Sequence, residues 1–137
     1  MKKPLVTLSF LLCAVWSFAQ GEFTKNVFLS KMELFQKDAV KAFQTQCVSN
    51  FMSGGSEESV GDLNRMIEMF NNFKVKERTF KDLNVRQFES TGVVTGQQNT
   101  VFERKDGTTF SQDVYITYAF VKNDNDWKMA YYSQRKK

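Results

Sequence analysis

Apolar residues recur at helical spacing in two segments of the first half of the chain. In residues 24–46 they fall three or four positions apart with lysines between them, the pattern of a helix with one buried and one solvated face. One long helix, or two short helices that meet near Lys37, fits this segment. A second stripe covers residues 63–70, and Ser59 or Asp62 is in position to cap its helix.

From residue 74 the pattern changes to that of β-strands rich in Val, Thr, Phe and Tyr. Asp106 and Gly107 predict a tight hairpin with a type I′ turn, and residues 123–126 predict a second turn. Residues 47–52 predict a short early strand, followed by a Gly/Ser turn at 53–56. Four further strands are predicted at residues 74–88, 92–104, 108–122 and 127–135. Helices followed by a meander of strands indicate an α+β domain, with helices packed on one face of an antiparallel sheet.

The N-terminus has the pattern of an export signal. Two lysines precede an apolar stretch at residues 5–18, and Ala19 completes a small-residue peptidase site. A membrane anchor is disfavoured, because the apolar run is shorter than the roughly 20 residues that span a bilayer. We therefore expect a cleavable signal peptide at 1–19 and one periplasmic or secreted domain at 20–137, with no stable membrane insertion after cleavage.

Composition excludes several kinds of chemistry. The chain has 19 Lys and Arg against 15 Asp and Glu, and two of those lysines belong to the signal, so no concentrated basic surface for nucleic acid is expected. There is no histidine, and Cys47 is the only cysteine after residue 19. A Cys-His nucleophile is therefore impossible, and a buried, inert Cys47 is favoured. Without His, clustered acids or a phosphate-binding Gly loop, we expect no metal and no cofactor.

Three stretches together resemble the nuclear transport factor 2-like superfamily. They are Val-Gly-Asp at 60–62 leading into a helix, the strand and turn at 89–96, and residues 118–129, where Trp127 opens the last strand. Within the superfamily the chain is similar to SnoaL-like proteins and their exported relatives. The resemblance implies a cystatin-like cone, in which helices close the concave face of a strongly curved sheet and leave a pocket.

What the resemblance implies for function is broad. Members include isomerases, dehydratases, polyketide cyclases, transport adaptors and oligomerisation modules, so the fold does not specify the chemistry. It also implies a homodimer that forms through the sheet. Relatives often carry an acid near the position of Gln46, and many enzymatic members use a pocket histidine. This chain has neither.

Hairpin pairing predicts which residues share the pocket face. We pair Lys122 with Trp127 in one hairpin and Lys105 with Thr108 in the other. A largely apolar wall with a few hydroxyls and amides is typical of small-molecule sites. A slip of one residue in either hairpin would exchange the two faces. The candidate ligand-binding residues on this register are Thr95, Gln97, Asn99, Tyr118, Trp127, Met129, Tyr131 and Ser133.

Three functions remain open at this point. The first is an exported domain that binds a small, partly apolar ligand. The second is an isomerase or dehydratase that uses proton transfer, with Tyr118 or Tyr131 polarising a carbonyl and Asp82, Glu103 or Asp113 as the base. The third is a non-catalytic oligomerisation or structural module. Because no base is obvious, the first and third are favoured, and whether the protein is an enzyme stays undecided.

Overall fold

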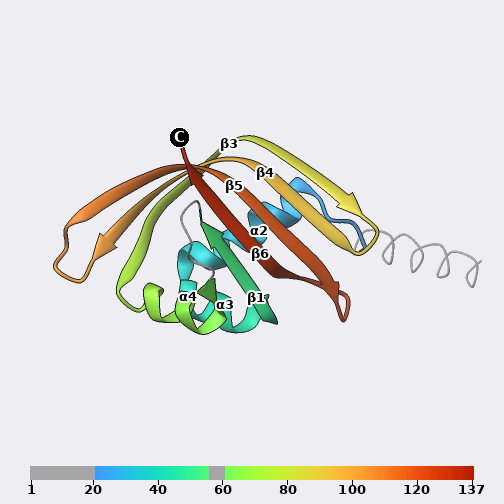
Figure 1. The fold of residues 1–137 in the computed structure, drawn as a ribbon, viewed down its shortest axis with the longest axis horizontal. Coiled ribbons are helices and arrows are strands. Elements are labelled where there is room, and N and C mark those ends of the chain that lie inside the picture. The colour runs from blue at the N-terminus through green and yellow to red at the C-terminus, as the bar shows by residue number, and fades with distance from the viewer. Residues whose placement is uncertain (1–20, 56–60) are drawn as a thin grey trace, which may run out of the picture.

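The computed structural model describes residues 21–55 and 61–137, in which three helices pack on a curved six-stranded sheet (Figure 1). The predicted signal peptide at 1–19, and Ser56 and Ser59 of the predicted turn and cap, lie outside the described residues. None of the helices in the described part of the chain is long and apolar enough to cross a membrane.

The first helical segment consists of two helices, α2 (Lys25–Lys37) and α3 (Ala39–Gln46). Thr24 caps α2, since its Oγ1 accepts a hydrogen bond from the Val27 amide at 3.2 Å. Asp38 ends α2 and caps α3, where its Oδ1 accepts from the Lys41 amide at 3.1 Å. The break is therefore a shared cap residue, and the two-helix alternative is correct.

Helix α4 (Leu63–Phe70) begins as one of the two predicted caps requires. The Asp62 carboxylate accepts a hydrogen bond from the Arg65 amide at 2.9 Å and so pairs one of the free donors of the first turn. Met66 is the buried side chain of this helix, and Asn71 follows its last turn.

The sheet has the strand order β2-β1-β6-β5-β4-β3. The long strands β3 (Phe73–Phe88), β4 (Thr91–Arg104), β5 (Thr109–Asn123) and β6 (Asp126–Lys136) form the predicted antiparallel meander. Strands β1 (Cys47–Gly55) and β2 (Gly61–Asp62) pair antiparallel with each other, but β1 runs parallel to β6. The α+β cone with helices on a curved sheet is therefore confirmed, and the sheet is mixed because β1, which follows α3, lies beside the last strand.

The early strand is longer than predicted. Strand β1 continues through Gly55, and Gly54 and Gly55 pair with Ser133 and Gln134 of β6. Parallel pairing with β6 supplies partners to this Gly/Ser segment, so tertiary contacts override its local turn preference.

The hairpin between β4 and β5 has a three-residue loop in place of the predicted two-residue turn. The Arg104 amide donates to the Thr108 carbonyl at 2.8 Å, and the Gly107 amide donates to the Arg104 carbonyl at 3.0 Å. Gly107 has φ of 85°. This is a type I turn closed by a left-handed glycine. The predicted pairing of Lys105 with Thr108 is therefore wrong, and β4 is shifted by one residue along β5.

The hairpin between β5 and β6 starts in the predicted register, with Lys122 opposite Trp127. Its two turn residues have positive φ, 49° at Asp124 and 63° at Asn125. The register then shifts between Ala119 and Phe120. Beyond that irregularity every residue of β6 is displaced by one position relative to the prediction.

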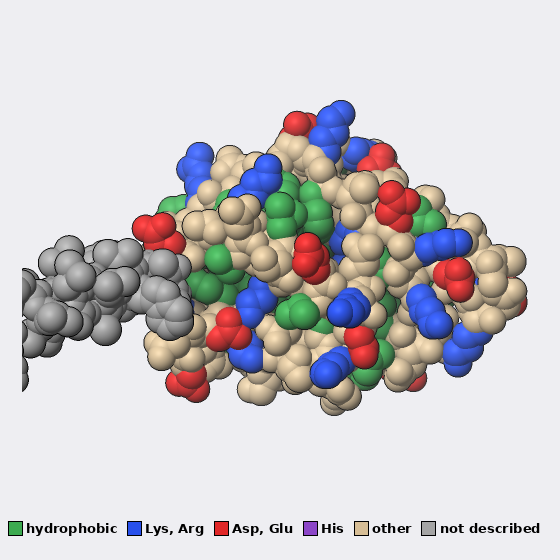
Figure 2. Space-filling view, turned by 180° about the vertical axis from the view of Figure 1, so that it is seen from behind, with side chains coloured by type: hydrophobic (Ala, Val, Ile, Leu, Met, Phe, Trp, Pro, Cys, Tyr) green, Lys and Arg blue, Asp and Glu red, His purple; other side chains and the backbone are tan. Residues whose placement is uncertain are grey.

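The core lies between the concave face of the sheet and the helices. Phe28 of α2 and Phe120 of β5 are completely buried, and their rings lie 6.1 Å apart. The sheet bends over α2, while the β4–β5 hairpin extends past the helical layer (Figure 1). On the face shown in Figure 2, basic and acidic side chains are interspersed with small hydrophobic patches. Surface charge on that face therefore does not single out a site.

Candidate functional site

A cavity of about 380 Å³ lies between the concave face of the sheet and the three helices. Most of its wall is apolar, and it contains no Asp or Glu among the described residues that line it. The apolar lining comes from Met32, Phe35, Ala39, Phe43, Met66, Met69, Phe70, Phe73, Phe102, Phe110 and Met129. The polar lining comes from Ser53, Arg65, Arg78, Gln98, Gln112, Tyr118, Tyr132 and Gln134.

A buried hydrogen-bonded chain crosses three strands at one side of this cavity. The Tyr118 hydroxyl donates to Gln98 Oε1 at 2.5 Å, and Gln98 Nε2 donates to Thr100 Oγ1 at 3.1 Å. Arg78 Nε donates to the same Thr100 oxygen at 3.5 Å. Tyr118, Gln98 and Thr100 are almost completely buried, whereas Arg78 is half-buried. The chain satisfies the buried polar groups and holds the Arg78 side chain toward the cavity.

Tyr132 extends this polar side. Its ring stacks on Tyr118 with centroids 4.7 Å apart, and its hydroxyl donates to Gln134 Oε1 at 2.6 Å. Burial raises the pKa of Tyr118 to about 12, although the charge of Arg78 and the Gln98 hydrogen bond oppose the shift. Burial also raises the pKa of Tyr132, and neighbouring Tyr118 adds to this effect. Both phenols are therefore neutral at physiological pH.

Three of the predicted site residues lie on the concave face. Tyr118 and Met129 line the cavity. Trp127 packs in the core beyond it, with its ring 5.1 Å from that of Phe23, and is not among the lining residues. Trp127 is thus a core residue, and its prediction as a ligand-binding residue is wrong.

The other five predicted residues do not face the cavity. On β4, the residues that line the cavity alternate with Thr95, Gln97 and Asn99, which therefore lie on the other face. On that face, Gln97 Nε2 donates to the Asp82 carboxylate at 3.1 Å. Tyr131 and Ser133 line a separate depression on the opposite face of the sheet, beside Tyr115. Their placement with Tyr118 was wrong, because each hairpin register is displaced by one residue and the strand side-chain period is two.

The residues that replace them are their sequence neighbours. Gln98 lies on the cavity side of β4, and Tyr132 and Gln134 lie on the cavity side of β6. Tyr118 is opposite Val94 and Tyr132 in the two pairings. For β4, the sequence signal that could have given the correct register was Asp106-Gly107, because Asp-Gly also fits a three-residue loop that ends in a left-handed glycine.

None of the predicted bases is among the described residues that line the cavity. Asp82 accepts from Gln97, as above. Glu103 pairs with Lys76 at 3.7 Å, and Asp113 pairs with Lys137 at 3.0 Å. These three acids are thus engaged away from the cavity.

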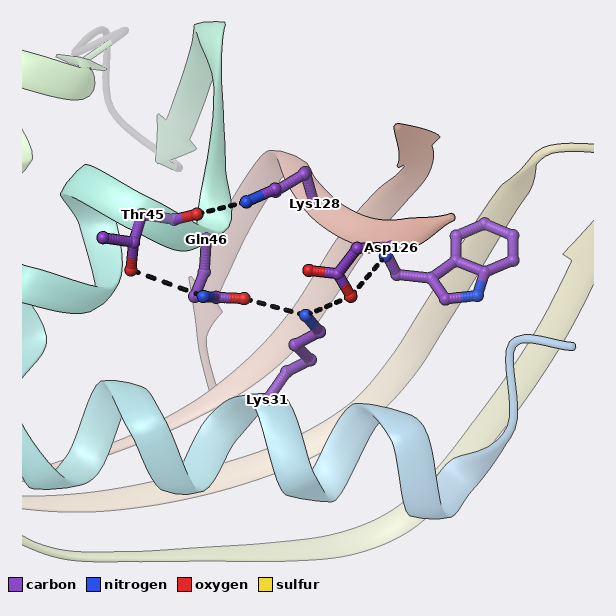
Figure 3. Close-up of polar contacts among 6 residues, drawn as sticks. Lys31, Thr45, Gln46, Asp126 and Lys128 are labelled. Atoms are coloured by element: carbon purple, nitrogen blue, oxygen red, sulfur yellow. Dashed lines mark hydrogen bonds and ion pairs between the residues drawn. The ribbon is translucent and has the colours of Figure 1, made fainter. Parts of the chain in front are cut away.

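A second polar cluster joins the helices to the start of β6 (Figure 3). Lys31 Nζ donates to Asp126 Oδ1 at 2.7 Å and to Gln46 Oε1 at 2.8 Å, and Lys128 Nζ donates to the Thr45 carbonyl. Gln46, at the position where the resemblance implied an acid in relatives, is held by Lys31 and does not line the cavity. The cluster ties α2, α3 and β6 together.

Cys47 lies next to this cluster and is partly buried. Burial raises the pKa of its thiol to about 12, although the charge of Lys128 opposes the shift. The thiol is therefore protonated and weakly nucleophilic at physiological pH. Within the described part of the chain, no three His, Cys, Asp or Glu side chains come together in a way that could hold a metal ion.

Comparison with known proteins identifies similar chains. The family model of the SnoaL-like domain matches residues 32–134. No curated protein matches the sequence. Among solved structures, a nuclear transport factor 2-like protein of unknown function from Prochlorococcus sp. NATL2A is 16% identical, with a TM-score of 0.72 over 84% of this chain and 94% of that chain.

Two further solved structures share the fold. A ketosteroid isomerase-like protein from Erwinia carotovora atroseptica is 12% identical, with a TM-score of 0.62 over 82% of this chain and 92% of that one. The CaMKII hub of S. rosetta is 18% identical, with a TM-score of 0.64 over 85% and 98%. At these identities the likeness establishes a common fold and leaves the chemistry open.

Proposed function

The chain belongs to the SnoaL-like domain family within the nuclear transport factor 2-like superfamily, and we propose that it is an exported domain that binds a small, partly apolar ligand in its cavity. Solved proteins of this fold include a ketosteroid isomerase-like protein and a CaMKII hub, so the fold alone does not select a function. The proposal depends on the cavity for the binding function and on the N-terminal sequence pattern for export.

The observation that carries the proposal is the composition of the cavity wall. Its volume of about 380 Å³ is within the range usual for small-molecule sites. Methionines and phenylalanines make most of the apolar wall, and the polar residues of the described lining are neutral or basic. Such a wall buries an apolar body while its polar groups orient the ligand.

The same geometry favours binding over proton transfer. A general base needs to reach its proton within hydrogen-bond distance, and the described lining contains no carboxylate. Tyr118 donates its single hydroxyl hydrogen to Gln98, so it has no hydrogen left for a ligand carbonyl. Together these features support a site that holds a molecule without converting it.

Binding is tested with the neutral fluorescent probe N-phenyl-1-naphthylamine, whose emission rises in apolar surroundings. Met69 lines the cavity and is 39% exposed, so Met69→Trp narrows the cavity without disturbing the core. Leu34→Trp is the matched control, because Leu34 is a helix residue of 44% exposure outside the lining. We expect saturable binding that weakens severalfold in Met69→Trp and is unchanged in Leu34→Trp. Absence of saturable binding, or equal binding by both variants, would contradict the proposal.

Export is tested separately, by expressing the full chain in a Gram-negative host and determining the N-terminus of the protein in each cell fraction. We expect a periplasmic product that begins at Gln20. A product that keeps residues 1–19 and stays in the cytoplasm would remove the export part of the proposal and leave the binding part standing.

Homodimer formation remains a further part of the proposal. The outer face of the sheet exposes Met52, Tyr115 and Tyr131 by 49%, 42% and 38%. Exposed aromatic and methionine side chains on one face are typical of protein contact surfaces. Light scattering after size exclusion should give the mass of two chains, and Tyr131→Lys should reduce it to one. A wild-type mass of one chain would contradict the dimer.

A further inference from the structure

The charged side chains among the described residues of the cavity lining have one sign. Arg65 of α4 and Arg78 of β3 both line it, and none of the described lining residues is acidic. A partly enclosed space with low-dielectric walls concentrates the field of such charges, because little water is present to screen them. The cavity therefore favours a ligand that carries negative charge.

Arg78 is the better placed of the two cations. It lies on β3 directly opposite Thr100, just past a register shift between Val75 and Glu77. Its Nε donates to Thr100 Oγ1 in a long hydrogen bond of 3.5 Å, and neither terminal nitrogen donates to another residue within the described part of the chain. No ion pair joins Arg78 to a carboxylate within the described part of the chain. Arg65, in contrast, is an exposed residue of the helix.

The groups around Arg78 are suited to an anion. The two stacked phenols of Tyr118 and Tyr132 stay neutral, because burial raises both of their pKa values. Arg78 is linked to the Tyr118 hydroxyl through Thr100 and Gln98, so its guanidinium lies on the same side of the cavity as this phenol. Gln134 accepts from Tyr132 through its oxygen, so its amide nitrogen still has hydrogens to donate. The terminal guanidinium nitrogens of Arg78 supply the charged donors that suit a carboxylate, and the Gln134 amide in the same cavity lining adds a neutral one.

The remainder of the wall is suited to a flat apolar body. Phe102 and Phe110 stack with centroids 5.1 Å apart, and Phe73 meets the Phe110 ring edge-on at 5.5 Å. Met66 and Met69 of α4 complete this part of the lining. Aromatic rings and flexible thioethers adapt to planar apolar groups better than branched aliphatic side chains do.

We propose that the cavity binds an organic acid with an apolar, ring-containing body, and that Arg78 receives its carboxylate while the phenylalanine and methionine side holds the body. This inference rests on the proposed binding function and adds the ligand class and the residue that selects it.

The test uses two competitors of equal size and shape, naphthalene-2-carboxylate and naphthalene-2-carboxamide, against bound N-phenyl-1-naphthylamine at neutral pH. In the wild-type protein the carboxylate should displace the probe at a concentration about tenfold lower than the amide, since charge-assisted hydrogen bonds to arginine are the stronger ones. The ratio of the two inhibition constants is measured within each variant, so any general weakening of the site cancels.

Arg78→Gln should bring this ratio close to one. Arg86→Gln is the matched control: it removes the same charge from an exposed position of the same strand, outside the lining, and should keep the wild-type ratio. Arg78→Lys keeps the positive charge but loses the paired guanidinium donors, so it should give an intermediate ratio. If circular dichroism shows that Arg78→Gln does not fold, the ratio in Arg78→Lys serves as the test of the role of Arg78.

Equal displacement by acid and amide in the wild type, or an unchanged ratio in the folded Arg78 variants, would overturn the inference while the binding function stands. Failure of the neutral probe itself to bind would overturn both.

Discussion

Replacing Gly92 by alanine should destabilise the wild-type protein but should not further destabilise a variant that lacks the Phe23 ring. A Cβ added at Gly92 would lie 2.2 Å from Cδ1 of Phe23, far inside van der Waals contact. Phe23 is 4% exposed, and its ring lies 5.1 Å from the rings of both Phe120 and Trp127. Its amide also donates to Gln87 Oε1 at 2.8 Å. The ring therefore cannot move aside without leaving its place in the core.

The magnitude follows from these contacts. Overpacking a filled core costs about 1–3 kcal/mol, and we expect Gly92→Ala to lose this much. Truncating a buried phenylalanine costs about 3–5 kcal/mol, which is the expected loss for Phe23→Ala. In the Phe23→Ala background the obstacle is gone, and alanine in a strand is more stable than glycine by roughly 0.5–1 kcal/mol. The coupling between the two sites should therefore be about 1.5–4 kcal/mol.

The assay is a double-mutant cycle from urea unfolding followed by circular dichroism, analysed as a two-state transition. Phe88→Ala is the control partner for Gly92→Ala, because Phe88 lies close by on β3 but is 59% exposed. Gly92→Ala should cost the same with and without Phe88. Additive effects of Gly92→Ala and Phe23→Ala would refute the reasoning, since they would show that the ring does not occupy the space above Gly92.

Three further predictions concern stability and reactivity. Burial alone would raise the pKa of Asp126, but the hydrogen bond and charge of Lys31 hold this pKa below its ordinary value. The ion pair therefore stabilises the fold above about pH 4. Lys31→Met should lower the free energy of unfolding in urea at neutral pH, and this loss should shrink as the pH falls below about 4. An equal loss at neutral and acid pH would contradict this. Cys47 should react slowly with Ellman's reagent in the folded protein and rapidly in urea, because burial raises its pKa to about 12 despite Lys128; fast native labelling would contradict its burial. Asp62→Ala should cost about 1 kcal/mol in urea unfolding while Asp62→Asn costs little, since only the second keeps a helix cap; equal costs would contradict the capping role.

The sequence predicts the secondary structure well where local chemistry decides it. Capping residues marked the start of α4, and Asp38 lies at the break between α2 and α3. The four long strands and the turn at Asp124 and Asn125 were apparent from β-propensity and turn residues. The parallel position of β1 was not, because it depends on contacts with β6, more than seventy-five residues later in the chain. No local pattern carries that information.

The site was harder to predict because its strands are polar on both faces. Along β4, the polar residues Thr95, Gln97 and Asn99 alternate with two buried polar residues, Gln98, which lines the cavity, and Thr100. Hydrophobic alternation therefore does not distinguish the faces. Register there depends on the loop conformation at Gly107 instead. The same holds on β6, where neighbouring tyrosines at 131 and 132 face opposite sides.

The residues that line such a cavity are therefore hard to predict from the sequence pattern for a physical reason. A strand that places polar side chains in a cavity is polar on both of its faces. The register of such a strand is weakly specified, because a shift by one residue exchanges similar side chains. In this chain two backbone features, the left-handed Gly107 and the irregularity beside Phe120, decide which amides and phenols enter the cone. Arg78 was not predicted because no turn residue set the register of β3 against β4, and a register shift lies just before it. The chemistry of the cavity is thus set by loop and bulge geometry, while the hydrophobic pattern sets the cone that encloses it.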